Sequence, residues 1–272
     1  MVRGSATVNA TGGNPASGRR LEELTSPDVA MAIEDRQLVV VPCGSTEQHG
    51  PHLPTGTDYY ASLTLADRVA SGLGGVVLTG FQFGPTPLHA GFAGTVTLRP
   101  ETYQSVLYEM VASVAAHGVT EAVFVNWHEG NIPSLGIVAS RLTQELGMNV
   151  VLAHACYVAE ELYGEKLGGL THGGAIEAGA VLAYRSELVH YDRLGGAEDS
   201  PGERAEDQAR RGKAFQTILR DVREIAPAGW YGSTQRLSVD DAKEMMDTVA
   251  AVVVREVSAR LAHLSRLRGA GR

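Results

Sequence analysis

Three short segments of the sequence place acidic and imidazole side chains beside glycines. Residues 44–54 read Gly-Ser-Thr-Glu-Gln-His-Gly-Pro-His-Leu-Pro, and Asp58 follows them. Residues 126–131 read Asn-Trp-His-Glu-Gly-Asn, and residues 171–177 read Thr-His-Gly-Gly-Ala-Ile-Glu. Carboxylates and imidazoles without thiolates are typical ligands of Zn²⁺, Mn²⁺ or Fe²⁺ in sites that also leave room for water. The segments therefore predict a hydrolytic metal site, with enough ligands for two ions.

The surrounding elements strengthen this prediction, because a single Glu-x-His triplet is common by chance. Short apolar runs predict four buried strands, over residues 37–42, 75–80, 121–126 and 149–154. Apolar side chains at helical spacing predict three amphipathic helices, over residues 101–116, 133–146 and 239–264. The first two ligand-bearing segments directly follow the first and third of these strands.

The alternation of strands and helices indicates the fold class. It implies right-handed crossovers and a parallel sheet covered by helices on both faces. In such a sheet, ligands bind beyond the carboxyl ends of the strands, where these segments lie. We expect one α/β domain over residues 21–268, a three-layer sandwich with a mainly parallel sheet. Residues 1–20 are rich in small polar side chains and are expected to form a flexible tail.

Composition excludes several classes of function. The 272 residues are 44% hydrophobic and 20% charged, as in soluble globular enzymes. The formal net charge is −8 without a dense basic cluster, which argues against nucleic acid or anionic membranes as partners. Two cysteines, Cys43 and Cys156, provide neither a disulfide framework nor a paired-cysteine zinc site. With no apolar run near the roughly 18 residues of a membrane span, we expect a cytoplasmic protein with a small-molecule substrate.

The longest segment resembles a motif of the creatininase (creatinine amidohydrolase) family. Residues 44–58, GSTEQHGPHLPTGTD, match the family's G-x-x-E-Q-H-G-P-H-L-P-x-x-x-D. Residues 126–131 are similar to its N-G-H-G-G-N, residues 172–177 to H-A-G-x-x-E, and residues 89–95 to H-x-G-F-P-G-T. The resemblance extends over roughly residues 21–260. It implies an α/β fold, metal-dependent hydrolysis of amide bonds and a homo-oligomer, commonly a hexamer.

The resemblance also implies a set of metal ligands. Glu47 and His128 would hold one divalent ion and His49 the other, with Asp58 bridging both. In creatininase a glutamate two residues after the motif histidine completes the second site, but this chain has Gly130 there. Glu177 is the expected replacement, and the neighbouring Glu129 remains an alternative.

The expected mechanism needs a nucleophile and a proton donor. Two divalent ions would lower the pKa of a shared water toward about 7, so that hydroxide attacks the carbonyl. The leaving nitrogen must be protonated, and we expect His172 to be the donor, with Glu129 as the next candidate. His52 is expected either to orient a metal ligand or to be a structural hydrogen bonder. A further set is expected to contact substrate: Trp127, His89 and Asn131.

These observations favour a binuclear metal-dependent hydrolase that cleaves a carbon–nitrogen bond of a small molecule, such as a cyclic amide or a formamide. One rival is a peptidase similar to the mycofactocin-maturation enzyme. Its motifs usually read N-G-H-G-G-N and H-A-G-x-x-E-T, whereas this chain has Trp127, Glu129 and Ala178 at the positions that differ. A noncatalytic metal-binding protein is a second rival, disfavoured because His172 accompanies an intact ligand set.

Overall fold

The structure, a computed structural model, describes residues 19–78, 81–194 and 217–269. Five strands form one sheet in the order β1-β3-β2-β4-β5, and every neighbouring pair is parallel. The strands are β1 (Arg19–Arg20), β2 (Leu38–Cys43), β3 (Val76–Val77), β4 (Glu121–Asn126) and β5 (Asn149–His154). All four predicted strands are present; of the strand expected over residues 75–80, Val76–Val77 form β3, and residues 79–80 lie outside the described residues. Residues 1–18 of the expected tail lie outside the described residues, while its last two residues form β1.

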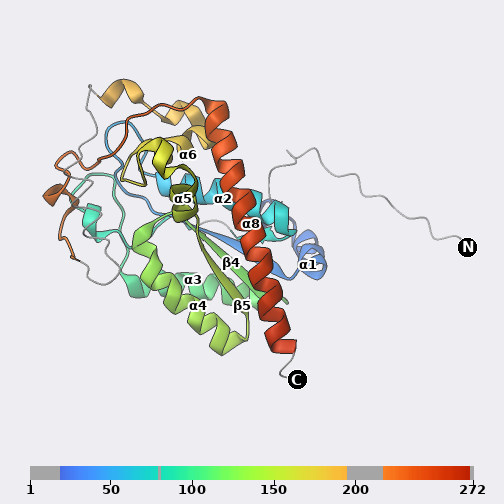
Figure 1. Cartoon of the computed structure of the whole chain (residues 1–272). Coiled ribbons are helices and arrows are strands. Elements are labelled where there is room, and N and C mark those ends of the chain that lie inside the picture. The colour runs from blue at the N-terminus through green and yellow to red at the C-terminus, as the bar shows by residue number, and fades with distance from the viewer. Residues whose placement is uncertain (1–18, 79–80, 195–216, 270–272) are drawn as a thin grey trace, which may run out of the picture.

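Helices cover both faces of the sheet (Figure 1). One face is covered by α1 (Ser26–Asp35), α3 (Pro100–Ala115) and α4 (Ile132–Leu146). The other is covered by α2 (Thr57–Leu73), α5 (Ala155–Leu167), α6 (Ala175–Arg185) and the long α8 (Val239–Gly269). Short 3-10 turns lie at Leu21–Glu23, Pro87–His89, Glu129–Asn131, Ser186–Leu188, Tyr191–Leu194 and Val222–Glu224. The expected three-layer α/β sandwich is confirmed, and the three predicted helices are α3, α4 and α8.

Side-chain alternation along the strands builds two separate cores. Val40 and Val123 point into the core beneath α2, α5, α6 and α8, whereas Val39 and Phe124 point into the core beneath α1, α3 and α4. The helices contribute apolar stripes at helical spacing, such as Leu135, Val138 and Leu142 on α4. Both faces of the sheet are therefore buried, as expected for parallel strands that are nearly all apolar.

The sheet register places the ligand-bearing segments side by side. Cys43 at the end of β2 pairs with Asn126 at the end of β4, and Asn126 pairs with His154. The loops that follow β2 and β4 consequently begin at the same level of the same edge. Gly44 allows the first loop to touch α2, since a Cβ there would lie 2.4 Å from the backbone nitrogen of Tyr59.

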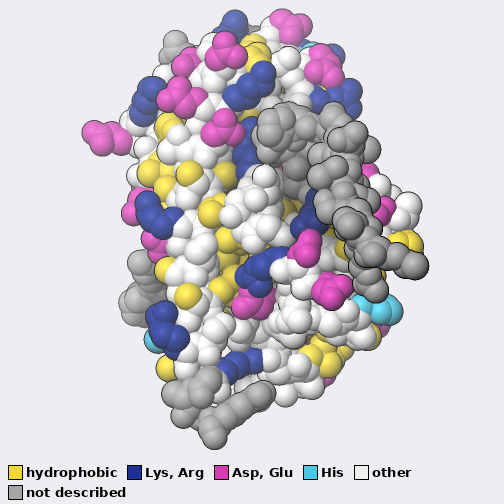
Figure 2. All heavy atoms as spheres, turned by 90° about the vertical axis from the view of Figure 1, so that its right-hand side faces the viewer, with side chains coloured by type: hydrophobic (Ala, Val, Ile, Leu, Met, Phe, Trp, Pro, Cys, Tyr) yellow, Lys and Arg dark blue, Asp and Glu magenta, His cyan; other side chains and the backbone are white. Residues whose placement is uncertain are grey.

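The surface and the helices show how charged and apolar side chains are distributed (Figure 2). On the face shown in Figure 2, Lys and Arg side chains are interspersed with Asp and Glu rather than gathered by sign. Among the described residues, several oppositely charged side chains pair, as Arg260 and Arg255 do with Glu256. None of the described helices is long and apolar enough to cross a membrane.

Candidate metal centre

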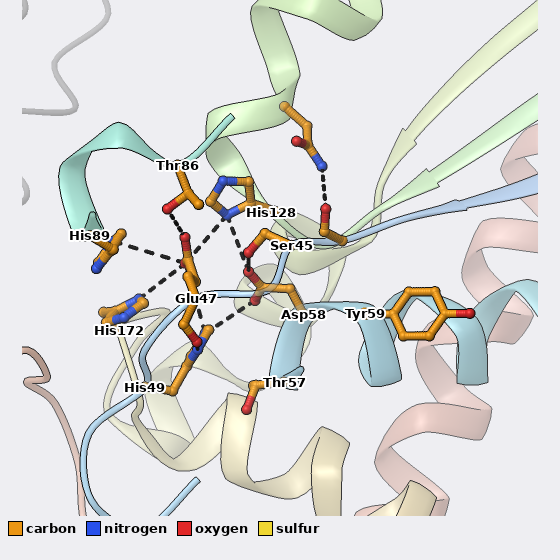
Figure 3. A network of polar contacts seen from close by, with 12 residues as sticks. Ser45, Glu47, His49, Thr57, Asp58, Tyr59, Thr86, His89, His128 and His172 are labelled. Carbon is orange, nitrogen blue, oxygen red and sulfur yellow. Dashed lines mark hydrogen bonds and ion pairs between the residues drawn. The ribbon is translucent and has the colours of Figure 1, made fainter. Parts of the chain in front are cut away.

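The predicted ligands converge at the carboxyl edge of the sheet. Glu47 and His49 lie on the loop after β2, and His128 lies on the loop after β4. Asp58 lies in the first turn of α2, where the helix N-terminus favours negative charge. All four side chains are buried, and Figure 3 shows them facing one another.

Glu47, Asp58 and His128 form the first group of potential ligand atoms. The Nδ1 atom of His128 lies 3.1 Å from Asp58 Oδ2 and 3.4 Å from Glu47 Oε1. On the other side of the ring, His128 Nε2 donates to the backbone oxygen of Pro85 at 3.0 Å. This hydrogen bond leaves the Nδ1 lone pair for a cation, a common arrangement for metal-binding histidines.

His49 forms a second group on the other side of Asp58. Its Nε2 atom lies 3.2 Å from Asp58 Oδ1 and 3.7 Å from Glu177 Oε2, while Nδ1 donates to the backbone oxygen of Glu47 at 3.0 Å. Glu177 lies in the first turn of α6, and its Oε2 also accepts a hydrogen bond from the backbone N–H of Gly173 at 2.6 Å. The two carboxylate oxygens of Asp58 thus face two histidines on opposite sides.

His172 adjoins both groups. Its Nδ1 atom lies 3.8 Å from Glu47 Oε1, and the residue can join His49 and Glu177 or Glu47 and His89 as a set of potential ligands. Its ring centroid lies 4.3 Å from that of His49 and 4.1 Å from that of His89. The three imidazoles therefore form a stack along one side of Glu47.

The electrostatics of this cluster fit divalent cations. Three carboxylates, Glu47, Asp58 and Glu177, are buried together, and within the described part of the chain their ion pairs are all with histidines. Burial raises the pKa of Glu177 to about 8. Burial alone would lower the pKa of His49, but Asp58 and Glu177 outweigh it and raise that pKa to about 10. In the metal-free protein, protons on the carboxylates and on the histidines balance the buried negative charge. A divalent cation can replace these protons, so the cluster is suited to binding metal ions.

The two candidates for the remaining ligand, Glu177 and Glu129, lie in different surroundings. A Cβ on Gly130 would lie 2.4 Å from His128 Nε2 and 2.4 Å from the backbone oxygen of Pro85, so this backbone has no room for a side chain there. Glu129 lines the adjacent cavity but belongs to none of the ligand groups found among the described residues. Glu177 Oε2 lies 3.7 Å from His49 Nε2, and Glu177 belongs to a group of potential ligands with His49 and His172.

A cavity of about 560 Å³ opens onto the cluster. The lining includes the side chains of Glu47, Asp58, His128, His172 and Glu177, together with Trp127 and His89, both expected to contact substrate. It also includes a set of apolar side chains, Leu88, Ile132, Leu170, Leu219, Val222 and Ile225. The cavity therefore combines the candidate ligands with apolar surface.

Asn131 and His52 have supporting positions. The Nδ2 group of Asn131 donates to the backbone oxygen of Gly44 at 2.9 Å and to Asn126 Oδ1 at 3.1 Å. Asn131 joins the two ligand-bearing loops and is not among the residues that line the cavity, in contrast to the substrate contact expected from sequence. His52 Nε2 donates to the backbone oxygen of Gly173 at 2.9 Å, and burial lowers the pKa of His52 to about 4.

Sequence reasoning missed three residues that orient ligands. Thr86 donates a short hydrogen bond to Glu47 Oε2, and Ser45 donates to Asp58 Oδ2 at 2.7 Å (Figure 3). Gln48 is buried and contacts both His89 and His172. Ser45 and Gln48 stand inside the long motif, which could have marked them, but no sequence signal connects Thr86 with Glu47.

A three-layer α/β domain with buried histidines and carboxylates gathered at the carboxyl edge of a parallel sheet defines an enzyme-like protein with a candidate metal centre. The sequence model of the family described as creatinine amidohydrolase matches residues 22–257. The chain belongs to the creatininase family, so the family prediction is confirmed.

Curated relatives include proteins with different substrates. The mycofactocin precursor peptide peptidase of Mycobacterium ulcerans is 30% identical over 230 residues, which cover 80% of this chain and 84% of the relative. The creatinine amidohydrolase of Pseudomonas putida is 30% identical over 178 residues, 58% of this chain and 68% of the relative. A crystal structure of creatinine amidohydrolase matches with a TM-score of 0.71 at 22% identity, covering 89% of this chain and 97% of the other. This last likeness confirms the fold.

Proposed function

We propose that this chain is a binuclear metal-dependent hydrolase that cleaves an amide carbon–nitrogen bond. The position of Asp58 carries the proposal, since its two oxygens face His128 at 3.1 Å and His49 at 3.2 Å. Glu47 and His128 would hold one divalent ion, of zinc, manganese or iron, and His49 and Glu177 the other. Bound there, such ions activate water and polarise a carbonyl.

The side chains of the chain itself would bind substrate and move the proton. Trp127 and His89 line the cavity beside the ligand cluster and would position the amide. Burial, with the charges of His89 and His49, lowers the pKa of His172 well below its usual value. A neutral His172 would first accept, at Nδ1, the proton that the attacking water loses, and would afterwards donate this proton to the leaving nitrogen. His172 thus keeps its expected role of proton donor, but it must first take up the proton that it later donates.

Metal analysis together with an activity panel tests this proposal. We expect two ions per chain, hydrolysis of at least one compound among lactams, formamides, hydantoins and short peptides, and loss of turnover after chelation. His172→Asn should retain both ions and lose about 10²- to 10⁴-fold in kcat. Full activity after exhaustive chelation would overturn the proposal. Tightly bound metal without any hydrolysis would favour the noncatalytic alternative.

A peptide substrate is the second candidate, and the cavity favours it. The lining of the cavity of about 560 Å³ includes several apolar side chains, which suit a peptide with apolar side chains better than a small polar cyclic amide. The 30% identity to a mycofactocin precursor peptide peptidase over most of both chains points the same way.

A substitution of an apolar residue in the cavity lining distinguishes a peptide substrate from a small cyclic amide. Leu88→Asp should raise KM for peptides with apolar side chains by about tenfold or more, because an apolar contact is replaced by a charge. It should leave KM for a small polar lactam nearly unchanged. The matched control is Leu146→Asp, at the end of α4, outside the cavity lining. Equal changes in KM for the peptide and for the lactam would argue against binding of a peptide side chain next to Leu88.

We also infer a cytoplasmic homo-oligomer with the hexameric assembly common in the family. Light scattering of the purified protein measures the assembly directly. A monomer at micromolar concentration would contradict this inference.

A further inference from the structure

The side-chain amide of Gln48 is held in one orientation by backbone groups at both of its ends. Its Oε1 atom accepts a hydrogen bond from the N–H of Gly50 at 3.0 Å. Its Nε2 atom donates to the backbone oxygen of Gly229 at 2.5 Å. Reversing the amide would oppose like groups at both ends, so the positions of its oxygen and nitrogen are fixed.

The same nitrogen lies between two of the stacked imidazoles. Gln48 Nε2 lies 2.8 Å from His89 Nδ1 and 3.0 Å from His172 Nε2. An amide nitrogen carries two hydrogens, and one of them is used by Gly229. The other can therefore serve only one of the two histidines.

A backbone oxygen decides which histidine receives that hydrogen. His172 Nε2 lies 2.6 Å from the backbone oxygen of Gln48, so this nitrogen must carry a hydrogen and donate it. It cannot also accept from the Gln48 amide. The second amide hydrogen consequently goes to His89 Nδ1, which must be the unprotonated nitrogen of that ring.

We propose that Gln48 is a positioning residue that fixes two stacked histidines in the same Nε2–H tautomer but with different nitrogens facing the site. His89 then carries its hydrogen on Nε2, and His172 presents the lone pair of Nδ1 toward Glu47. The distance from His89 Nε2 to Glu47 Oε1 is 3.9 Å, too long for a hydrogen bond, so this N–H is available to a substrate oxygen in the cavity. One ring is a donor and its neighbour an acceptor, which extends the proposed function by assigning substrate binding to His89 and proton acceptance to His172.

A glutamine suits this position better than an acid of the same shape. An ionised glutamate side chain would offer no hydrogen to Gly229 or His89, and it would add a fourth carboxylate to a buried cluster that already holds three. His89 would then have to donate from Nδ1 and present a bare Nε2 to the cavity. The substitution Gln48→Glu should thus reverse the tautomer of His89 with little change in volume.

Solid-state ¹⁵N NMR of the metal-free protein with labelled histidine tests the proposal without requiring a known substrate. Protonated and bare ring nitrogens have well-separated shifts, and the signals of His89 are assigned by their loss in His89→Asn. We expect the Nε2–H tautomer of His89 in the wild type and the Nδ1–H tautomer in Gln48→Glu. The matched control is Gln104→Glu on α3, where the same chemical change affects a hydrogen bond to Ser134. It should leave the spectrum of His89 unchanged.

The wild-type spectrum is decisive even if Gln48→Glu does not fold. A wild-type His89 protonated on Nδ1 would overturn the proposal, and so would an unchanged tautomer in a folded Gln48→Glu. Gln48→Met removes both donations without adding charge and should leave His89 in a mixture of tautomers. Once a substrate is found, Gln48→Glu should lower kcat by about 10- to 100-fold while both metals are retained. If no amide is hydrolysed, the proposed function is wrong. The NMR spectrum of the metal-free protein still tests the role of Gln48, because it does not depend on activity.

Discussion

The two sides of Asp58 look alike in chemistry but differ in how the chain builds them. On each side a histidine donates from its far nitrogen to a backbone oxygen, of Pro85 for His128 and of Glu47 for His49. The His128 side consists of loops after the adjacent strands β2 and β4. The His49 side is completed by a residue of α6, far along the chain. The first side therefore depends on sheet register, and the second depends on how a helix packs.

Removing Asp58 should have the largest effect, because it abolishes what the two sides share. Asp58→Ala should lose both ions and reduce turnover to background. Asp67→Ala, in the same helix, is the control, since Asp67 is also buried but pairs with Arg20. We expect this control to unfold more easily yet to bind two ions, as measured by elemental analysis. Two tight ions in Asp58→Ala would exclude a bridging role.

Glu177→Gln should affect one side only. Its carboxylate faces His49, and it shares no ion pair with His128 among the described residues, so we expect one ion to be lost and the other retained. Glu129→Gln should keep both, because Glu129 belongs to neither ligand group. Calorimetric metal titrations of the two variants measure the difference. The opposite pattern would transfer the ligand role to Glu129.

Gly130→Ala should weaken the His128 side more modestly. The new methyl group would meet His128 Nε2 and the backbone oxygen of Pro85, and so disturb the hydrogen bond that orients the ring. Loss of such a supporting contact typically costs about 10- to 100-fold in metal affinity. Gly136→Ala on α4 is the control, because a Cβ there meets nothing within 4 Å. It should be neutral in metal binding and slightly stabilising, by about 0.5–1 kcal/mol.

His52 should produce the smallest effect, visible only in acid. Its pKa is about 4 in the folded protein against an ordinary value of 6.5, so the unfolded chain binds a proton first as the pH falls. The free energy of unfolding should therefore decrease between pH 6.5 and about 4, with little contribution above pH 6.5. In His52→Gln this decrease should be smaller by about 1–3 kcal/mol. Denaturant unfolding of the two metal-free proteins gives the comparison, and parallel pH profiles would contradict it.

The contrast between the two sides also explains what the sequence could and could not predict. Strand patterns and the long motif placed Glu47, Asp58 and His128 together, because parallel strands end at one edge. The hydrogen bond from Thr86 to Glu47 and the apolar lining of the cavity at Leu219 depend on loops. The sequence of a loop has no hydrophobic periodicity from which its path could be predicted. Asn131 is expected from the sequence to contact substrate, and the structure adds that its amide joins two loops. A polar residue in a motif can hold a loop in place beneath a site, or it can line the site and contact substrate. The residue type is the same in both cases, so the sequence does not distinguish these roles.

The two-core architecture gives each half of the domain its own chemical reporter. The chain has two cysteines, and one lies in each core: Cys43 beneath α1, α3 and α4, and Cys156 beneath α2, α5, α6 and α8. Both thiols are fully buried, with exposed fractions of 2% and 0%, and burial raises the pKa of each. A thiol reagent can therefore label either cysteine only when its layer opens. The labelling rates of Cys43→Ala and Cys156→Ala would measure the opening of one layer of helices independently of the other.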